Sequence, residues 1–338
     1  MPCRSFRWAG VRITCQRDVF SRRLSTVCQT QSPVNIADFQ RDAFHAERPL
    51  AIRKSANLQD TELPAMTEWF SPSSQFGAIF TPHLQRFSAA SLPYELILPA
   101  NNASDPRNIH HFLDWLARTD DPFRRSLASF LTEHISYLER NSETEPGTRF
   151  LRFEAPLALL EAGLRFNQES PDGSVLQQLY IAQAPLNTLP KELQDDVPAP
   201  DIVTKAGRGD IYDSSVWIGL EPTYTPWHRD PNPNLFYQLW SSKVVRLMPP
   251  RRGEQLFLEA RARLGHGGSS RIRGEEMMQG AERQVLLDAV WGKGVSDDMS
   301  EVSLDRGDAL FIPKGWWHSV KSAGSHGSLN ASVNWWFR

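Results

Sequence analysis

The 338-residue sequence has few cysteines, little net charge and no long apolar run. Its three cysteines all lie within the first 28 residues, so the rest of the chain contains no disulfide and no cysteine metal site. No stretch approaches about 18 uninterrupted apolar residues, which argues against a transmembrane helix and a membrane partner. The formal charge of −2 gives no general attraction to nucleic acid. Hydrophobic residues make up 40% of the chain, enough for a sizeable packed core.

The first 30 residues differ in charge from the rest of the chain. They contain six arginines and one acid, a net charge of +5, whereas residues 31–338 sum to −7. An arginine-rich, acid-poor leader with Ser and Thr is typical of a mitochondrial transit peptide, and SRRLST at 21–26 offers a processing neighbourhood. We therefore predict a transit peptide over residues 1–30 and a mitochondrial location. The alternative is a disordered basic tail on a protein of the cytoplasm or nucleus.

Apolar periodicity predicts a helix-rich region over residues 31–174. Four residues recur at the spacing of one helix face: Ile109, Phe112, Leu113 and Leu116. A second apolar stripe covers residues 123–138 and ends in the polar run 141–148. Earlier, residues 48–70 indicate a short strand followed by a helix that starts near Pro64.

From about residue 175 the sequence changes to short apolar runs separated by Pro, Gly, Asn and Asp, which is typical of an all-β region. Eight of the eleven tryptophans lie in this part. The expected strands cover residues 175–183, 215–220, 234–240, 243–249, 309–313 and 330–337. An insertion at 252–300 contains a polar loop at 264–274 and a helical pattern over 275–290. We predict one β domain over residues 175–338, with the helix-rich region packed on it.

The segment TPWHRDPNPNLFYQLWSSK, residues 225–243, contains two candidate metal ligands, His228 and Asp230. On a strand, residues two apart point to the same face at about 6.5–7 Å, so both side chains can bind one ion. His318, in GDALFIPKGWWHSV, supplies a third ligand. Two imidazoles and one carboxylate on one side of an ion leave its other positions open, as in non-haem Fe(II) oxygenases.

Lys243 follows His228 by fifteen residues, after a Ser241–Ser242 turn. We expect this turn to fold the chain back as a hairpin and to place the ammonium group near the metal. With the Thr225 hydroxyl it would form a clamp suited to the distal carboxylate of 2-oxoglutarate. Taken singly, an HxD tripeptide is commonly a solvated turn and a lysine commonly lies on the surface. Their combination indicates a site.

These residues resemble the JmjC-type, cupin-like oxygenases, and within them the asparaginyl hydroxylase that acts on hypoxia-inducible factor. The pattern T-x-x-H-x-D, followed by Asn, Phe and Lys, has the family's internal spacing, and the resemblance covers residues 175–338. It implies a mainly β core, a double-stranded β-helix or jelly roll, with a helix-rich N-terminal region and a helical insertion. It also implies Fe(II) bound by His228, Asp230 and His318, with 2-oxoglutarate and dioxygen as co-substrates. Thr225 and Lys243 would hold 2-oxoglutarate.

Two further segments match this family. LYIAQ resembles the segment whose tyrosine hydrogen-bonds the co-substrate, so Tyr180 is a candidate. SVNWWF resembles the closing strand whose asparagine lies by the metal, so Asn334 is another, and Asn234 matches the asparagine that follows the first two ligands. Either Trp316 or Trp336 is a candidate for lining the substrate channel, where an apolar wall would keep water from the oxidant.

The expected reaction is hydroxylation of a protein or peptide side chain. Hydroxylation of a modified base in transfer RNA and demethylation of methyl-lysine are alternatives, although the Lys and Arg residues of 251–263 are diluted by acids. A non-catalytic cupin-like binding module is an alternative of another class, which would be expected to lose a ligand or Lys243. A metal-dependent isomerase or dioxygenase without 2-oxoglutarate would need no such lysine. The oligomeric state stays open.

Overall fold

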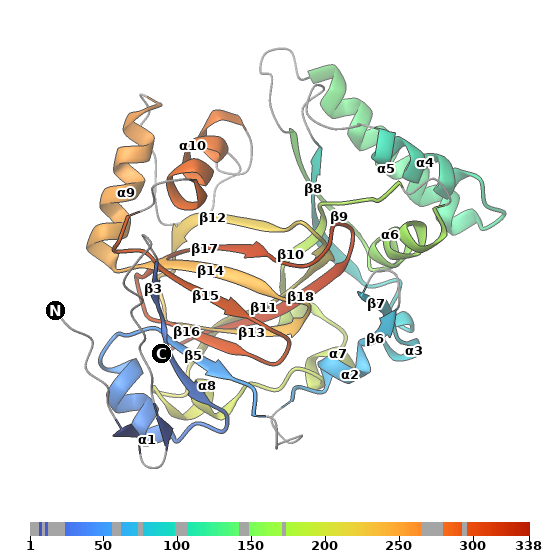
Figure 1. The fold of residues 1–338 in the computed structure, drawn as a ribbon. Coiled ribbons are helices and arrows are strands. Elements are labelled where there is room, and N and C mark those ends of the chain that lie inside the picture. The colour runs from blue at the N-terminus through green and yellow to red at the C-terminus, as the bar shows by residue number, and fades with distance from the viewer. Residues whose placement is uncertain are drawn as a thin grey trace.

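The computed structural model describes residues 7–8, 11–12, 24–55, 62–73, 77–98, 107–141, 149–170, 174–264, 280–292 and 296–338. Within these residues, two β-sheets face each other and helices surround them (Figure 1). The fold is therefore the mainly β jelly roll with added helices that the sequence predicts.

The larger sheet has nine strands. In spatial order they are β4 (Cys28–Gln31), β5 (Leu50–Arg53), β16 (Ala309–Ile312), β13 (Asn234–Trp240), β18 (Leu329–Phe337), β11 (Ile211–Leu220), β10 (Leu179–Pro185), β8 (Ser91–Leu98) and β9 (Arg149–Pro156). Neighbouring strands are antiparallel except β4 and β5. β13 is buried at every position because β16 and β18 occupy its two edges and both of its faces are covered.

The smaller sheet has five strands and closes the jelly roll. In spatial order they are β12 (Tyr224–Arg229), β17 (Trp317–Ser322), β14 (Lys243–Met248), β15 (Ser300–Leu304) and β3 (Ser25–Thr26). Apolar side chains fill the space between the two sheets, with Phe236 and Leu310 from the larger sheet against Val245 and Val302 from the smaller. β12 is an edge strand, where Pro226 is tolerated because no ladder partner needs its missing N–H.

Short helices and two small hairpin sheets complete the described chain. The helices are α1 (Ile36–Phe39), the π-helix η1 (Gln40–Phe44), α2 (Ala65–Glu68), α3 (Pro82–Gln85), α4 (Arg107–Ala117), α5 (Pro122–Asn141), α6 (Ala158–Glu169), the 3-10 helix η3 (Leu186–Thr188), α7 (Lys191–Asp195), α8 (Asp201–Lys205), α9 (Pro250–Ala262) and α10 (Gly280–Trp291). The hairpins pair β1 (Arg7–Trp8) with β2 (Val11–Arg12) and β6 (Phe70–Ser73) with β7 (Gly77–Phe80). Within the described residues, no helix has both the length and the hydropathy to cross a membrane.

The N-terminal half contributes both helices and strands. The stripe over residues 109–116 is buried as one face of α4, as predicted. On α5, Leu127, Leu131 and Ile135 are buried, whereas Phe123 at the start of the predicted second stripe is exposed. The same half also supplies β4 and β5 at one edge of the larger sheet and β8 and β9 at the other. The region beside the jelly roll is thus less helical than the periodicity suggests. A domain boundary at residue 175 stays a prediction.

Helices α9 and α10 cover the outer face of the smaller sheet (Figure 1). Trp227 and Trp317 stack there at 5.9 Å between ring centroids and pack against Phe257 of α9. Gly253 permits this approach, since a Cβ atom at that position would lie 2.3 Å from Cγ of Trp317. Because side chains alternate along a strand, the residues after these tryptophans, His228 and His318, point to the inside of the jelly roll.

Most of the predicted leader, including residues 1–6 and 13–23, lies outside the described residues. Residues 7–8 and 11–12 form the hairpin of β1 and β2, whereas residues 25–30 join the two main sheets: β3 pairs with β15, β4 pairs with β5, and Val27 between them is buried. Cleavage after residue 30 would remove β3 and most of β4. The transit peptide stays a prediction, and processing compatible with this fold has to occur before Ser25 and would leave Cys28 in the mature chain.

Candidate metal centre and its cavity

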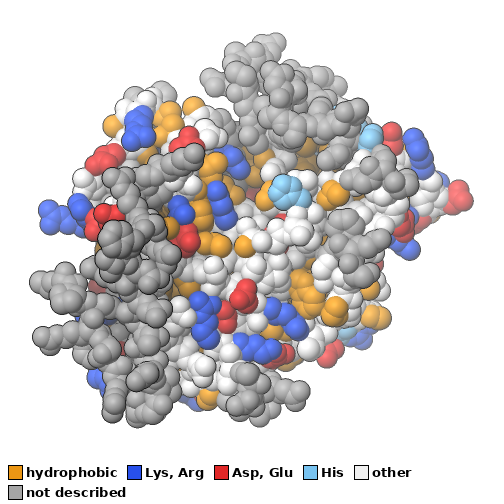
Figure 2. Space-filling model, in the orientation of Figure 1, with side chains coloured by type: hydrophobic (Ala, Val, Ile, Leu, Met, Phe, Trp, Pro, Cys, Tyr) orange, Lys and Arg blue, Asp and Glu red, His pale blue; other side chains and the backbone are white. Residues whose placement is uncertain are grey.

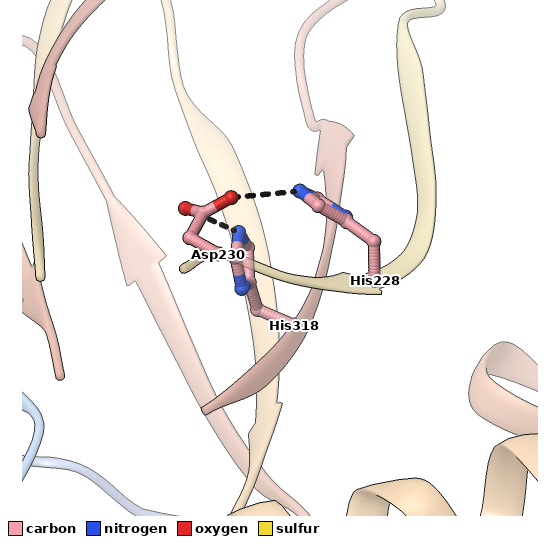
Figure 3. Close-up of side chains that lie close together, drawn as sticks. All are labelled: His228, Asp230 and His318. Carbon is pink, nitrogen blue, oxygen red and sulfur yellow. Dashed lines mark ion pairs between the residues drawn. The ribbon is translucent and has the colours of Figure 1, made fainter. Parts of the chain in front are cut away.

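The three predicted metal ligands converge (Figure 3). His228 on β12 and His318 on β17 are direct cross-strand partners, and Asp230 directly follows β12. His228 Nε2 lies 3.8 Å from Asp230 Oδ1, and His318 Nε2 lies 3.7 Å from Asp230 Oδ2. All three donor atoms lie within 4.8 Å of one another. One metal ion can bridge such a set, since bonds from a metal to imidazole or carboxylate are about 2.0–2.2 Å long.

Each imidazole is oriented by a carbonyl two residues earlier in the chain. Nδ1 of His228 donates to the carbonyl of Pro226 at 2.8 Å, and Nδ1 of His318 donates to that of Trp316 at 3.2 Å. A carbonyl oxygen can only accept, so Nδ1 carries the proton and the Nε2 lone pair faces the other donors. Metal-binding histidines are commonly oriented by such a hydrogen bond. The local backbone therefore prepares both imidazoles as ligands.

Three side chains hold the Asp230 carboxylate in place. Its Oδ2 accepts hydrogen bonds from Asn234 Nδ2 at 2.9 Å and from Trp336 Nε1 at 2.8 Å. Asn334 Nδ2 in turn donates to Asn234 Oδ1 at 2.9 Å. Burial by itself would raise the pKa of Asp230, but the two imidazoles and these hydrogen bonds outweigh burial and lower it below its ordinary value. Asp230 therefore stays ionised and available as a ligand.

A cavity of about 340 Å³ lies beside this triad. All eight predicted site residues line it: Thr225, His228, Asp230, His318, Lys243, Tyr180, Asn234 and Asn334. Trp217, Phe236 and Val320 add apolar wall, and Trp336 lines the cavity as well. Trp316 is not among the described lining residues, because its indole N–H donates to the carbonyl of Glu47 outside the jelly roll. The volume suits a small molecule together with one inserted side chain.

Lys243 brings a buried cation into this cavity. It is 3% exposed, and its Nζ donates to Ser332 Oγ at 2.8 Å and to Tyr180 Oη at 3.2 Å. Within the described chain, Lys243 forms no ion pair. Burial lowers its pKa to about 7, although Glu221 nearby opposes this shift. The ammonium group also lies over the rings of Phe236 and Tyr180, at 5.3 and 5.7 Å from their centroids. A buried ammonium group without a carboxylate partner is costly, and a carboxylate ligand in the cavity would compensate it.

The expected hairpin at Ser241–Ser242 is wrong. β13 lies in the larger sheet and β14 in the smaller, so the turn carries the chain from one sheet to the other. The physical reason is that β16 and β18 already occupy both edges of β13. Ser241 adopts a positive φ of 59° at this crossing. Lys243 reaches the cavity from the opposite sheet.

Two polar contributors were not anticipated from the sequence, Ser332 beside Lys243 and the indole N–H of Trp336 on Asp230. Both lie on β18 with Asn334 between them. Residues two apart on a strand share a face, so the placement of Asn334 beside the metal also predicts Ser332 as a cavity residue, and it agrees with the candidate role of Trp336 in the cavity wall. That signal was present in the sequence.

Comparison with known proteins agrees with this geometry. Residues 36–338 match the family model described as a cupin-like domain. The chain is 29% identical over 178 residues to lysine-specific demethylase JMJ30 of Arabidopsis thaliana, covering 52% of this chain and 36% of that protein. It is 28% identical over 160 residues to Jumonji C domain-containing protein 5 of Drosophila melanogaster and 27% identical over 160 residues to lysine-specific demethylase 8 of Danio rerio, covering in each case 47% of this chain and 36% of the relative.

The comparison therefore extends over only about a third of the length of these three relatives. The family model, in contrast, covers all but the first 35 residues of this chain. The resemblance to JmjC-type proteins that the motif spacing indicated is confirmed at the level of the family. The chain belongs to the cupin-like domain family, with relatives among the JmjC lysine demethylases.

Proposed function

We propose that the protein is an Fe(II)- and 2-oxoglutarate-dependent oxygenase of the JmjC type. One observation carries this proposal: His228, Asp230 and His318 converge on one side of a cavity that also contains the buried cation Lys243. A ferrous ion bound with 2-oxoglutarate supplies activation of dioxygen for oxidation of a C–H bond, with conversion of 2-oxoglutarate to succinate and carbon dioxide. The two-histidine, one-carboxylate donor set fits this ion.

The surrounding residues have separate tasks in this proposal. Lys243, with the hydroxyl groups of Tyr180 and Thr225, would hold the distal carboxylate of 2-oxoglutarate. Asn234 and Trp336 keep the Asp230 carboxylate in its ligating orientation. The apolar wall of the cavity limits the access of water to the reacting centre.

The substrate we propose is a protein or peptide side chain. Two observations support different outcomes at that side chain. The pattern T-x-x-H-x-D with its following Asn, Phe and Lys resembles the asparaginyl hydroxylase that acts on hypoxia-inducible factor, which favours a hydroxylated product. The names of two relatives, both lysine-specific demethylases, favour oxidation of a methyl group on lysine. Both reactions begin with the same C–H oxidation.

Nucleic acid is a weaker candidate substrate. Among the described residues on the face that Figure 2 presents, Lys and Arg side chains are interspersed with Asp and Glu. The lining of the cavity contains one cation, Lys243, and one further acid, Asp213, besides the metal ligand Asp230. An RNA-binding surface would be expected to carry a basic stripe. A modified base in transfer RNA is therefore the control in the test below.

The test is a screen for stimulated succinate release. Iron-loaded protein is incubated with 2-oxoglutarate, dioxygen and either peptide libraries that contain Asn, Lys or methyl-lysine, or transfer RNA. We expect a peptide to stimulate succinate release, and mass spectrometry of that peptide to show one added oxygen or the loss of a methyl group. Stimulation by transfer RNA alone would refute a protein substrate. Iron-loaded protein that binds no 2-oxoglutarate would refute the oxygenase itself and favour a non-catalytic binding module.

A further inference from the structure

A second pocket lies on the outer face of the smaller sheet, and we propose that it binds a small anion bearing carboxylate or phosphate groups. This outer pocket has a volume of about 210 Å³ and lies between α10, β8 and the outer face of β12 and β17. Its floor includes Tyr224 and Lys321, and Arg283 of α10 forms part of its wall. In Figure 2, Lys and Arg side chains lie beside hydrophobic ones next to α10 on this face.

The outer pocket and the catalytic cavity lie back to back. Tyr224 and Lys321 are cross-strand partners that face the outer pocket, and their neighbours Thr225 and Val320 are cross-strand partners that line the cavity. This follows from the alternation of side chains along β12 and β17. Tyr180 contributes to both linings. The two spaces are thus distinct, with one layer of β-sheet between them.

Two cations of the outer pocket have no ion-pair partner among the described residues. The Arg283 guanidinium lies 5.1 Å from the centroid of the Tyr224 ring, and Lys321 Nζ lies 5.8 Å from the same centroid and 4.6 Å from that of Trp291. In the described part of the chain neither of them forms an ion pair or a hydrogen bond, and Nε of Arg283 is buried without a partner. Arg246 nearby differs, since its Nε donates to Glu301 at 2.7 Å.

Positive charge is in excess among the described lining of this pocket, with Arg283 and Lys321 against Glu95. Burial lowers the pKa of Lys321, Arg246 and Arg283 lower it further, and Asp288 only partly opposes them. Burial also lowers the pKa of Arg283. Glu95 on β8 is the acidic residue among the described lining, and it is buried. Such an arrangement favours an anionic ligand, because both cations are partly buried and an anion in the pocket could pair with them.

The size and chemistry of the outer pocket limit the class of ligand. About 210 Å³ accommodates a small molecule and not a polymer segment. A guanidinium group offers parallel N–H donors to a carboxylate or a phosphate, and the ammonium group of Lys321 adds a second charge. The hydroxyl group of Ser322 lies in the same lining. A compact multivalent anion fits these features best.

The experiment titrates inorganic phosphate and citrate separately into the protein and measures binding by calorimetry. Because Lys243 could itself bind an anion in the catalytic cavity, the titrations are repeated with Lys243→Met. Arg283→Gln and Lys321→Gln each remove one cation of the outer pocket. Lys314→Gln is the matched control, since Lys314 is exposed and lines a different pocket.

We expect saturable binding of at least one of the two anions to the parent, to Lys243→Met and to Lys314→Gln. Arg283→Gln and Lys321→Gln are each expected to weaken it at least about tenfold, the loss typical for one charged hydrogen bond. Comparing the two affinities shows whether the outer pocket prefers a phosphate or a carboxylate ligand. Absence of saturable binding by both anions, or unchanged affinity in both Arg283→Gln and Lys321→Gln, would overturn the proposal. Neither result depends on the oxygenase activity.

Discussion

His228 and His318 are direct cross-strand partners, with their ring centroids 4.2 Å apart. One strand of the pair precedes Asp230, and the other arrives from a distant part of the chain after the helical insertion. The ligand set therefore forms only when β12 and β17 pair in this register. A slip of one residue would turn the imidazoles to the outer face, where the tryptophans now pack.

Replacing Lys243 by methionine should weaken the binding of 2-oxoglutarate and stabilise the metal-free protein. The affinity for 2-oxoglutarate is expected to fall at least about tenfold with the loss of the charged contact. The free energy of unfolding is expected to rise by about 1–4 kcal/mol, because an apolar side chain replaces a buried cation without an ion-pair partner. Calorimetric titration and denaturant unfolding measure the two effects. A lower free energy of unfolding in Lys243→Met would contradict the view that the buried ammonium group destabilises the fold.

The stability gain of Lys243→Met should depend on pH with a defined sign. Burial lowers the Lys243 pKa to about 7 from an ordinary value of 10.5, so between these values the unfolded chain binds the proton that the folded chain has lost. The parent therefore gains stability as pH rises from about 7 towards 10.5, whereas Lys243→Met lacks this gain. The two unfolding curves should approach each other across that window. If the free energies of unfolding of the parent and of Lys243→Met changed with pH in parallel, the lowered pKa of Lys243 would be contradicted.

Apparent affinity for 2-oxoglutarate should decrease as pH rises above about 7, since Lys243 loses its charge there. On the acid side, Asp230 remains ionised because its pKa is lowered. Iron binding is nevertheless expected to weaken on acidification, because metal ligands must be deprotonated to bind. Measuring the affinity for 2-oxoglutarate at several pH values above about 7 checks the expected alkaline decrease. In Lys243→Arg, which keeps its charge, the alkaline decrease should disappear.

Trp336→Phe should weaken iron binding by about 10- to 100-fold, the range found when a group that orients a ligand is removed. The ring is kept, but the hydrogen bond to Asp230 Oδ2 is lost. Trp316→Phe is the matched control, because its indole N–H donates to Glu47 away from the cavity. Competition with an iron chelator gives both affinities. Equal affinities in the two variants would show that Trp336 does not position the carboxylate.

Removal of residues 1–31 should reduce stability more than removal of residues 1–23 does. The longer deletion takes away β3, β4 and the buried Val27. Thermal unfolding of the two truncated proteins makes the comparison. If the leader directs import into mitochondria, the mature N-terminus determined by mass spectrometry should lie before Ser25. A mature chain that begins after residue 31 and unfolds at the temperature of the full chain would contradict this.

Two of the three metal ligands could be predicted from a local signal, whereas His318 lies far along the chain and was assigned from its place after an expected strand. His228 and Asp230 have the two-residue period of a strand, and Lys243 lies at a fixed distance along the same segment. Asn334 and Tyr180 were placed by resemblance, and both line the cavity.

The strands that carry the site were harder to predict. β12 and β17 were not among the expected strands because polar site residues occupy their inner face, which weakens the apolar alternation. The strands that pair with β14 could not be predicted from the sequence either. A short turn favours a hairpin, but which sheet accepts the next strand depends on which edges are still open, and that is a property of the whole fold.

The most direct measurement of the central claim is iron content together with 2-oxoglutarate turnover in Asp230→Ala and in Arg229→Gln. Arg229 lies between the two ligands in sequence but faces Glu254 of α9 at 3.4 Å. The account predicts that the parent and Arg229→Gln bind iron and release succinate, and that Asp230→Ala loses both properties while remaining folded. Full iron content and parental turnover in Asp230→Ala would contradict the metal centre described here.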